Sequence, residues 1–436
     1  MDKFFSPKSV AVFGASRSLE KPGRVVVQNL LHSGFSGKIY PVNPHADEIA
    51  NLEVFTSETV PKADLGVFVI PAKIVPKNLE IVADRLKSAL VISGGFGESG
   101  NSELDTRLLE ISKKYDLRIW GPNCLGLMNT HQNFNLTFLP TSRLPMPPKG
   151  GVSILSQSGA TVASVLDWAG TIQLGISKVA SYGNQLDVSD YEILDYYQKD
   201  KETSVIGFYV EGLKEGKKLL EVAREGKKPV IVLKAGKTGS GVRAAKSHTG
   251  ALAGNFEVFK GISSQLKWGM ACGPEEFLLS LKARNIWQSH IKNVGVVTCG
   301  GGFGVMVSDS LEELGMGLSN FSEKTTESLK KAFPQRVSIK NPVDLTGDAT
   351  PEMFGTAIDA LMSDGSVDAI VVVLLMQLPK LNSEIIDILQ NYSDSEKPVV
   401  VVSPPGAYAS GINKLITDLP VVSSPEKAAG VLRVIR

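Results

Sequence analysis

Short, continuous apolar runs alternate with helix-like stretches along the whole chain. Runs such as SVAVFG (9–14) and SALVIS (88–93) show no polar–apolar alternation, whereas PKNLEIVADRLK (76–87) has the 3.6-residue period of a helix. Strands that are apolar on both faces are typical of a parallel sheet covered by helices on each side. The pattern therefore predicts an α/β protein built on doubly wound parallel sheets.

A proline-rich segment, LPTSRLPMPPKGG (139–151), interrupts this alternation. A chain of 436 residues exceeds one ordinary domain, and clusters of proline and glycine commonly separate domains. We interpret the segment as a domain boundary. The sequence predicts three domains, at residues 1–130, 150–287 and 292–436.

The last two of these domains contain similar stretches. GVSILSQSGATVASVLDWAG (151–170) and NVGVVTCGGGFGVMVSDSLEELG (293–315) each read as an apolar strand, a tight turn of small residues and a helix. KKPVIVLKAG (227–236) and EKPVVVVSPPG (396–406) stand in the same relative places further on. We interpret the pair as two related domains. The regular alternation of strands, turns and helices in all α/β proteins produces part of this likeness by itself.

Composition excludes several classes of protein. The 46 basic and 45 acidic residues nearly cancel, which does not favour a nucleic-acid partner. The three cysteines are far apart, as expected for a reducing compartment without a disulfide framework, and no histidine has metal-ligand spacing with another histidine or cysteine. The N-terminus lacks the layout of a signal peptide, and the longest apolar run (369–376) is far shorter than the ~20 residues that span a bilayer. We expect a soluble cytoplasmic protein without a metal site of its own.

Three turns of small residues follow predicted strands: GASRS (14–18), SQSGAT (156–161) and CGGGFG (299–304). In open α/β sheets, ligands bind beyond the carboxyl ends of the strands. A helix that begins there presents free backbone N–H groups and the positive end of its dipole, which suits an anion. Turns like these also simply connect strands to helices, but two of them at matching places in the related domains favour a shared anion site if the domains pack face to face.

The first turn also invites a dinucleotide interpretation. However, the segment lacks the G-x-G-x-x-G spacing, and Asn43 and Pro44 stand where an NAD site expects Asp or Glu for the ribose hydroxyls. An NAD-dependent oxidoreductase is therefore disfavoured, and a different phosphate-bearing nucleotide is expected.

Five motifs together resemble the NDP-forming acyl-CoA synthetases, and within them the alpha subunit of ADP-forming acetyl-CoA synthetase, a relative of succinyl-CoA synthetase. They are SVAVFGAS (9–16), GPNCLGLMN (121–129), SQSGA (156–160), SYGN (181–184) and SHTGALAG (247–254). The resemblance covers essentially the whole chain. It implies a Rossmann-like CoA-binding domain followed by two flavodoxin-like domains, the first of which carries a mobile histidine loop. It also implies that the ATP-grasp domains, which bind ADP or ATP and Mg, lie on a separate beta subunit in an α2β2 assembly.

The resemblance assigns roles by position. His248 matches the phosphorylated histidine, and Glu211 matches the carboxylate that orients it. The expected phosphate-binding residues are Ser156, Gln157, Ser158, Gly159, Ala160, Gly300, Gly301 and Gly302. The expected CoA-binding residues are Gly14, Ser16, Arg17, Asn43, Pro44, Pro71, Ala72, Phe96 and Asn123, and the acyl pocket is expected at Gly183 and Asn184. RSLEKPGR (17–24) differs in detail from the family pattern, which leaves the CoA contacts of this loop open.

The implied reaction converts acyl-CoA, phosphate and ADP to acid, CoA and ATP through acyl phosphate and phosphohistidine. Imidazole suits such a relay because its free pKa of ~6.5 leaves a neutral nucleophilic nitrogen at pH 7. The segment around His248 is rich in Gly, Ser and Ala, which leaves little bulk to obstruct its motion. The alternative hypothesis is a non-catalytic CoA-binding or regulatory protein that retained the fold.

Overall fold

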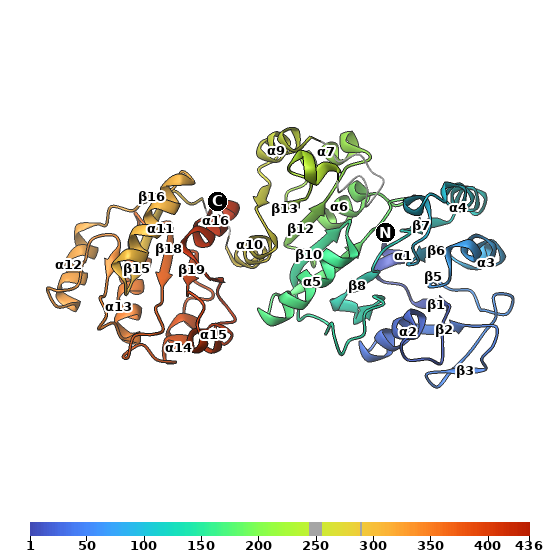
Figure 1. Ribbon diagram of the computed structural model, residues 1–436, viewed down its shortest axis with the longest axis horizontal. Coiled ribbons are helices and arrows are strands. Elements are labelled where there is room, and N and C mark those ends of the chain that lie inside the picture. Colours follow the sequence, from blue (N-terminus) through green and yellow to red (C-terminus); the bar gives the residue numbers. More distant parts are fainter. Residues whose placement is uncertain (244–254, 288–289) are drawn as a thin grey trace. The chain divides into compact units, whose positions relative to one another are not determined.

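The computed structural model describes residues 1–243, 255–287 and 290–436. The chain folds into two compact units (Figure 1). Unit 1 contains residues 1–170 and 174–267, and unit 2 contains residues 171–173 and 268–436. Each unit is an α/β structure, as the alternation of apolar runs predicted.

The first sheet of unit 1 is parallel and has the strand order β2-β1-β5-β6-β7. Its strands are β1 (Ser9–Phe13), β2 (Lys38–Val42), β5 (Leu65–Phe68), β6 (Ser88–Val91) and β7 (Arg118–Trp120), and the helices of this region are α1 (Asp2–Phe5), α2 (Pro22–His32), α3 (Val75–Val82) and α4 (Ser102–Tyr115). The apolar strands are buried on both faces, and the stacked rings of Phe13 and Phe68 lie 4.4 Å apart in the core. The order reverses beside β1, so the carboxyl ends of β1 and β5 form a switch point where ligands bind in such sheets.

The second sheet of unit 1 has the order β13-β12-β10-β11-β8-β9, of which β8 and β9 are antiparallel to their neighbours. Its strands are β8 (Leu127–Asn129), β9 (Phe134–Asn135), β10 (Lys149–Ser156), β11 (Ile176–Ser181), β12 (Val205–Val210) and β13 (Val230–Lys234), and its helices are α5 (Gly159–Thr171), α6 (Asp190–Lys199), α7 (Gly216–Glu225) and α9 (Phe256–Gln265). The proline-rich segment 139–151 lies inside unit 1 and does not separate the two units. The division into three domains therefore stays a prediction.

Unit 2 has a parallel sheet of order β16-β15-β18-β19-β20, with β17 paired to β15. The strands of this sheet are β15 (Asn293–Thr298), β16 (Gly317–Leu318), β17 (Val343–Asp344), β18 (Ala369–Val373), β19 (Val399–Val402) and β20 (Val421–Val422). Unit 2 also contains β14 (Gly269–Ala271), which is not part of this sheet. Its helices are α10 (Pro274–Ile286), α11 (Gly301–Glu313), α12 (Glu323–Ala332), α13 (Pro351–Met362), α14 (Ile385–Gln390), α15 (Ala407–Asn413) and α16 (Pro425–Ile435). The order β16-β15-β18-β19 repeats the order β11-β10-β12-β13 of unit 1, which agrees with the expected relation between the two regions.

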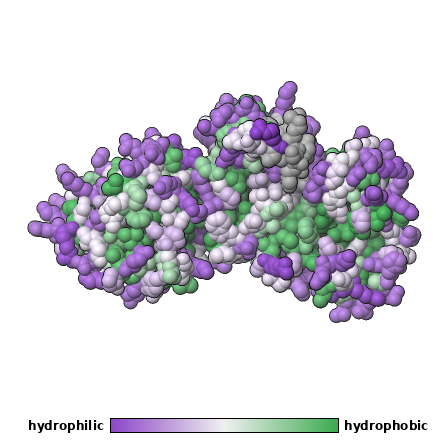
Figure 2. All heavy atoms as spheres, in the orientation of Figure 1, coloured by the Kyte–Doolittle hydropathy of each residue, from purple (hydrophilic) through white to green (hydrophobic). Residues whose placement is uncertain are grey.

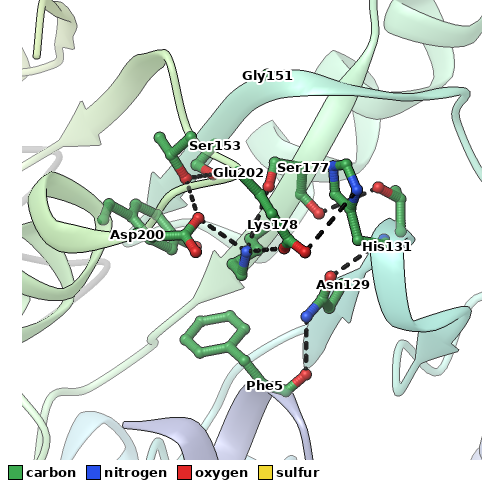
Figure 3. A network of polar contacts seen from close by, with 12 residues as sticks. Phe5, Asn129, His131, Gly151, Ser153, Ser177, Lys178, Asp200 and Glu202 are labelled. Atoms are coloured by element: carbon green, nitrogen blue, oxygen red, sulfur yellow. Dashed lines mark hydrogen bonds and ion pairs between the residues drawn. The ribbon is translucent and has the colours of Figure 1, made fainter.

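A buried lysine fastens the amino-terminal half of β11 (Figure 3). The side chain of Lys178 is 2% exposed, and its ammonium contacts Asp200 Oδ2 at 2.8 Å and Glu202 Oε2 at 2.6 Å. Two carboxylates and the hydroxyl of Ser177 surround the buried charge, as a buried cation requires. This network lies away from the carboxyl ends of the strands and holds the sheet together rather than facing a ligand. Within the described part of the chain, no helix is both long enough and apolar enough to cross a membrane.

Candidate active site

The turn between β10 and α5 lies where β10 and β12 end, at the switch point of the second sheet. Ser156 Oγ donates to the carbonyl of Ser158 at 2.8 Å, and Ser158 Oγ accepts from the backbone N–H of Thr161 at 3.2 Å. The hydroxyl of Ser158 thus satisfies one N–H of the first turn of α5. Gly159 and Ala160 also belong to this turn, whose N–H groups have no partners within the helix. They present hydrogen-bond donors to an anion.

Glu211 follows β12 beside this turn and is held through its main chain. Gln157 Oε1 accepts from the N–H groups of Glu211 at 2.9 Å and of Gly212 at 3.1 Å. The Lys234 ammonium donates to the carbonyl of Glu211 at 2.7 Å. The residue is only 6% exposed. The side-chain carbonyl of Gln157, predicted to bind phosphate, therefore holds the Glu211 backbone.

A cavity of about 790 Å³ opens at the end of α5 where this turn lies. It extends to the switch point of the first sheet, since Ile70 and Pro71 follow β5. The described residues that line it are Pro22, Val69, Ile70, Pro71, Ile92, Ser93, Gly94, Asn123, Cys124, Leu125, Phe138, Leu139, Gln157, Ser158, Gly159, Ala160, Ala163, Gly183 and Asn184, and none of these carries a charge. Figure 2 shows apolar side chains gathered on unit 1 over the region where Figure 1 labels β8. The cavity joins the two sheets of unit 1 and suits a long, largely uncharged ligand that ends at an anion site.

Asn184 connects the two sheets beside the cavity. Its amide Nδ2 donates to Glu98 Oε2 at 2.5 Å, its Oδ1 accepts from Asn123 Nδ2 at 3.3 Å, and its carbonyl accepts from the Lys214 ammonium at 2.6 Å. Burial alone would raise the pKa of Glu98, but hydrogen bonds from the Gly95 N–H and the Asn184 amide outweigh burial and hold this pKa below its usual range. We refer to Glu98, Asn123, Asn184 and Lys214 as the clasp. In the clasp, the polar groups of Asn184 are hydrogen-bonded to other residues of the protein. These bonds fix the loop of Gly183 and Asn184, which lines the cavity.

Gly183 brings this loop close to the segment GPNC. It has a φ of +55°, and a Cβ at this position would overlap the carbonyl oxygens of Pro122 and Asn123. Only glycine adopts this backbone conformation in so little space. Gly183 is thus required for the close approach on which the clasp depends.

The matching turn of unit 2 has different surroundings. Gly300 N–H donates to Thr298 Oγ1 at 3.0 Å, and the Thr298 hydroxyl contacts the Gly300 carbonyl at the same distance. A Cβ on Gly301 would lie 3.0 Å from Asp344 Oδ2, so a carboxylate already stands next to the first residue of α11. That charge competes with an anion for the same helix end. A shared anion site formed by this turn and the turn of α5 stays a prediction, because the two turns belong to different units.

Comparisons with known proteins bear on the whole chain. Residues 8–130 match a CoA binding domain, residues 149–281 the flavodoxin domain of succinyl-CoA ligase type, and residues 294–418 a ligase-CoA domain. The alpha subunit of acetate–CoA ligase [ADP-forming] I from Pyrococcus furiosus is 36% identical over 99% of this chain and 96% of its own length. The chain belongs to the NDP-forming acyl-CoA synthetase family. The family predicted from the five motifs is therefore confirmed.

Members of this family differ in length. The acetate–CoA ligase [ADP-forming] of Methanocaldococcus jannaschii is 44% identical over 79% of this chain, but only 49% of that protein is covered. The chain therefore spans about half the length of this relative, and 55% of one from Archaeoglobus fulgidus. A solved structure described as dinucleotide-forming acetyl-coenzyme A synthetase 1 of Ca. Korarchaeum cryptofilum, in complex with phosphate and ADP, superimposes with a TM-score of 0.91 at 31% identity. It covers 100% of this chain, and the match covers 96% of the solved one.

The cavity brings together many of the site residues expected from the family resemblance. Those that line it are Pro71, Asn123, Gln157, Ser158, Gly159, Ala160, Gly183 and Asn184. Ser156 lies in the same turn, and Gly300, Gly301 and Gly302 lie at the start of α11 in unit 2. His248 lies outside the described residues.

The remaining expected CoA residues surround the switch point of the first sheet without lining the cavity. Gly14 directly follows β1 with a φ of +93°, and Ser16 lies two positions further on. Arg17 Nε donates to the Glu48 carbonyl at 3.4 Å, and Asn43 Nδ2 donates to the Ala15 carbonyl at 2.6 Å. Asn43 thus ties the end of β2 to the first turn. Pro44 follows it, Ala72 starts the segment before α3, and Phe96 is 0% exposed.

Sequence reasoning missed part of the cavity wall. Ile92, Ser93 and Gly94 follow β6 as Pro71 follows β5, so the rule that ligands bind at strand ends could have found them. Leu139 begins the proline-rich segment and Phe138 directly precedes it; this segment looked like a linker and carries no ligand signal. Cys124 lines the cavity but is buried, and burial raises the pKa of its thiol to about 12. This favours packing, as expected, over a nucleophilic role.

Proposed function

We propose that this chain is the alpha subunit of an ADP-forming acyl-CoA ligase of the acetate–CoA type. The reaction converts acyl-CoA, phosphate and ADP to acid, CoA and ATP. The observation that carries the proposal is one continuous cavity in unit 1, which runs from the carboxyl end of β5 to the first turn of α5. A thioester that enters from the CoA-binding sheet would meet phosphate at that turn.

The proposed order of the chemistry is the one that the family resemblance implies. Phosphate held by the N–H groups of Gly159 and Ala160 attacks the thioester carbonyl, and the CoA thiolate leaves. A nitrogen of His248 then attacks the phosphorus of the acyl phosphate, and the carboxylate of the acid leaves. Glu211 accepts a hydrogen bond from the other ring nitrogen, which sets the tautomer and stabilises the positive charge on the ring. Phosphohistidine finally transfers its phosphoryl group to ADP.

The uncharged cavity wall supports the acyl class. A carboxylate at the end of an acyl group would be buried there without a cation among the described lining residues, and burying an unpaired charge is costly. Neutral acyl groups such as acetyl avoid this cost. We assign the acyl group to the region around Gly183, with the amide of Asn184 held by the clasp.

The proposal includes a partner. The Pyrococcus relatives are named as alpha subunits, which supports a second subunit for this chain. We propose an ATP-grasp beta subunit that binds ADP, ATP and Mg, an α2β2 assembly, and a cytoplasmic location. In this scheme, Gly300, Gly301 and Gly302 of α11 contribute to the phosphate site in the assembled enzyme.

Intact-mass analysis tests the proposal. The purified chain is incubated with acetyl-CoA and phosphate, with His248→Ala as the matched control. We expect the wild-type chain to gain the mass of one phosphoryl group, which acid removes, and the variant to gain none. If neither acetyl-CoA nor longer acyl-CoA thioesters phosphorylate a chain that binds CoA, the non-catalytic CoA-binding alternative replaces the proposal. Tight NADH binding without CoA affinity would instead favour an oxidoreductase.

A further inference from the structure

Tyr209 is the penultimate residue of β12 and stands two positions before Glu211. Its phenolic hydroxyl donates to Glu211 Oε1 at 3.2 Å. The role that the family resemblance gives to Glu211 does not extend to this tyrosine, and its side chain does not line the cavity. It therefore contacts the carboxylate from the protein side.

Tyr209 is also fastened to the turn before α5. Its carbonyl accepts from the Gln157 N–H at 3.3 Å, and its phenol has the Thr161 side chain as a second hydrogen-bond neighbour. Thr161 Oγ1 in turn donates to Ser158 Oγ at 3.1 Å. A chain of hydrogen-bonded groups thus leads from Ser158, which lines the cavity, through Thr161 and Tyr209 to Glu211.

The phenol keeps its proton at neutral pH. Burial, together with the nearby Glu211 carboxylate, raises the pKa of Tyr209 to about 12. A protonated phenol that donates to a carboxylate stabilises the ionised form of that carboxylate. It also selects one of the orientations that the carboxylate plane could adopt.

We propose that Tyr209 is a positioning residue for Glu211, whose carboxylate it holds in fixed register with the anion turn of α5. The proposal rests on the proposed function for the purpose of this arrangement, namely that Glu211 orients His248. In this proposal, Tyr209 acts only through the carboxylate.

Other charged or titratable groups face Glu211 from the neighbouring elements. Lys234 on β13 donates to its carbonyl, and burial lowers the pKa of this lysine while the Glu211 carboxylate opposes that shift. Tyr182 after β11 has a pKa raised mainly by burial and partly by the Asp190 and Glu211 charges. Gln157 contributes an uncharged amide. Tyr209 differs from these groups because its hydroxyl donates to the carboxylate itself. Removing the hydroxyl therefore perturbs the carboxylate and leaves in place the contacts of Gln157 and Lys234 with the Glu211 backbone.

The test measures Glu211 directly. Carbon-13 NMR of the chain labelled at glutamate carboxyl groups gives the resonance of the Glu211 carboxyl group at pH 7, with the Glu211→Gln spectrum as the assignment. We expect Tyr209→Phe to shift that resonance, because the carboxyl group loses a hydrogen-bond donor. An unchanged resonance overturns the proposal, whether or not the chain is an active ligase.

Activity gives the second readout. Tyr209→Phe is expected to slow single-turnover phosphorylation of His248 on the order of tenfold. Tyr197→Phe is the matched control, because this buried tyrosine donates to the Ile154 carbonyl at 3.3 Å and has no recorded contact with Glu211. The double variant Tyr209→Phe/Glu211→Gln is expected to be no slower than Glu211→Gln alone. A further loss in the double variant would show that Tyr209 acts independently of Glu211 and would overturn the proposal.

Failure of the proposed function looks different. In that case the wild-type chain takes up no phosphoryl group from acetyl-CoA and phosphate, while the NMR spectra still decide whether Tyr209 holds Glu211. A shifted Glu211 resonance in Tyr209→Phe then supports the positioning role in a chain that does not catalyse the reaction.

Discussion

The strand–turn–helix from β10 to α5 and the one from β15 to α11 have the same place in sheets of the same strand order, yet their helix ends face different surroundings. The turn of α5 lines a cavity without charged described residues. The turn of α11 has the carboxylate of Asp344 beside Gly301. Both helices carry the positive end of a dipole, but only at α5 does the described structure of its own unit leave that end available to an anion.

This difference shows that the free N–H groups of a helix N-terminus do not by themselves make an anion site. Side chains from other elements decide whether these donors are occupied by the protein or remain available to a ligand. At α5, the side-chain carbonyl of Gln157 accepts from the backbone N–H groups of Glu211 and Gly212. The turn is therefore joined to Glu211 through its main chain and not through its carboxylate. At α11, a carboxylate oxygen of Asp344 lies 3.0 Å from the position that a Cβ on Gly301 would take, so a negative charge already stands near the start of this helix.

The largest effect is expected at the loop that closes the α5 side. Gly183→Ala places a Cβ against two backbone carbonyls at a positive φ, so we expect a loss of about 3 kcal/mol or more in the free energy of unfolding, or failure to fold. Gly170→Ala is the control, because a Cβ there meets nothing within 4 Å. Urea unfolding followed by circular dichroism measures both. Equal stabilities would show that the loop is not held as described.

Ser158→Asp tests the asymmetry of the two turns. Asp is as good a helix N-cap as Ser, so the fold should keep its stability, but the new carboxylate takes the place of an anion. We expect phosphohistidine formation to fall on the order of 100-fold. Asp344→Asn removes the charge from the other turn and should not slow the reaction. It should also lower the stability of unit 2 by about 0.5 kcal/mol, since a carboxylate near a helix N-terminus is stabilising. Equal losses of activity in the two variants would remove the distinction between the turns.

Two buried carboxylates extend the comparison to pH. Burial raises the pKa of Asp190, at the start of α6, to about 6, so its contribution to the free energy of unfolding falls as pH rises from about 4 to about 6. Asp364 in unit 2 is also buried, yet the N–H groups of Ser366 and Ser322 donate to it and hold its pKa well below the usual range. Its stabilising contribution is present above its unfolded pKa of about 3.9 and disappears as pH falls.

The corresponding variants should therefore have opposite signs. Asp190→Asn should stabilise the chain by up to about 2 kcal/mol at pH 7 and by little at pH 4. The amide can also donate to Gln185 Oε1, a buried oxygen without a recorded hydrogen bond. Asp364→Asn should destabilise the chain at pH 7, and the loss should shrink towards low pH. Urea unfolding between pH 2 and pH 8 measures both, and slopes of the same sign would contradict this assignment.

The smallest expected effect concerns the first turns of the two helices. A Cβ on Gly302 of α11 meets nothing within 4 Å, so Gly302→Ala should raise the free energy of unfolding by about 0.5–1 kcal/mol. A Cβ on Gly159 of α5 lies 3.3 Å from Leu125 Cβ, which should cancel most of that gain. Thermal unfolding compares them. A larger gain at Gly159 would mean that the cavity wall at Leu125 is looser than described.

The sequence could predict features that depend on local pattern. Apolar runs gave the parallel sheets, and small residues after strands located the turn at Ser158 and the loop at Gly183. The partners of polar side chains could not be predicted, because they come from distant parts of the chain. Gln157 holds Glu211 across 54 positions, and Asn184 meets Glu98 across 86. Family motifs marked Gln157 and Asn184 as site residues, but only the fold shows that their amides hold the protein together.

The most direct test of the anion assignment is a crystal structure of the chain grown with molybdate, an anomalous scatterer that mimics phosphate. We predict a peak within hydrogen-bond distance of the N–H groups of Gly159 and Ala160 in the wild-type protein, and no peak there in Ser158→Asp. A wild-type crystal with the turn of α5 empty and molybdate bound at the start of α11 would contradict the account.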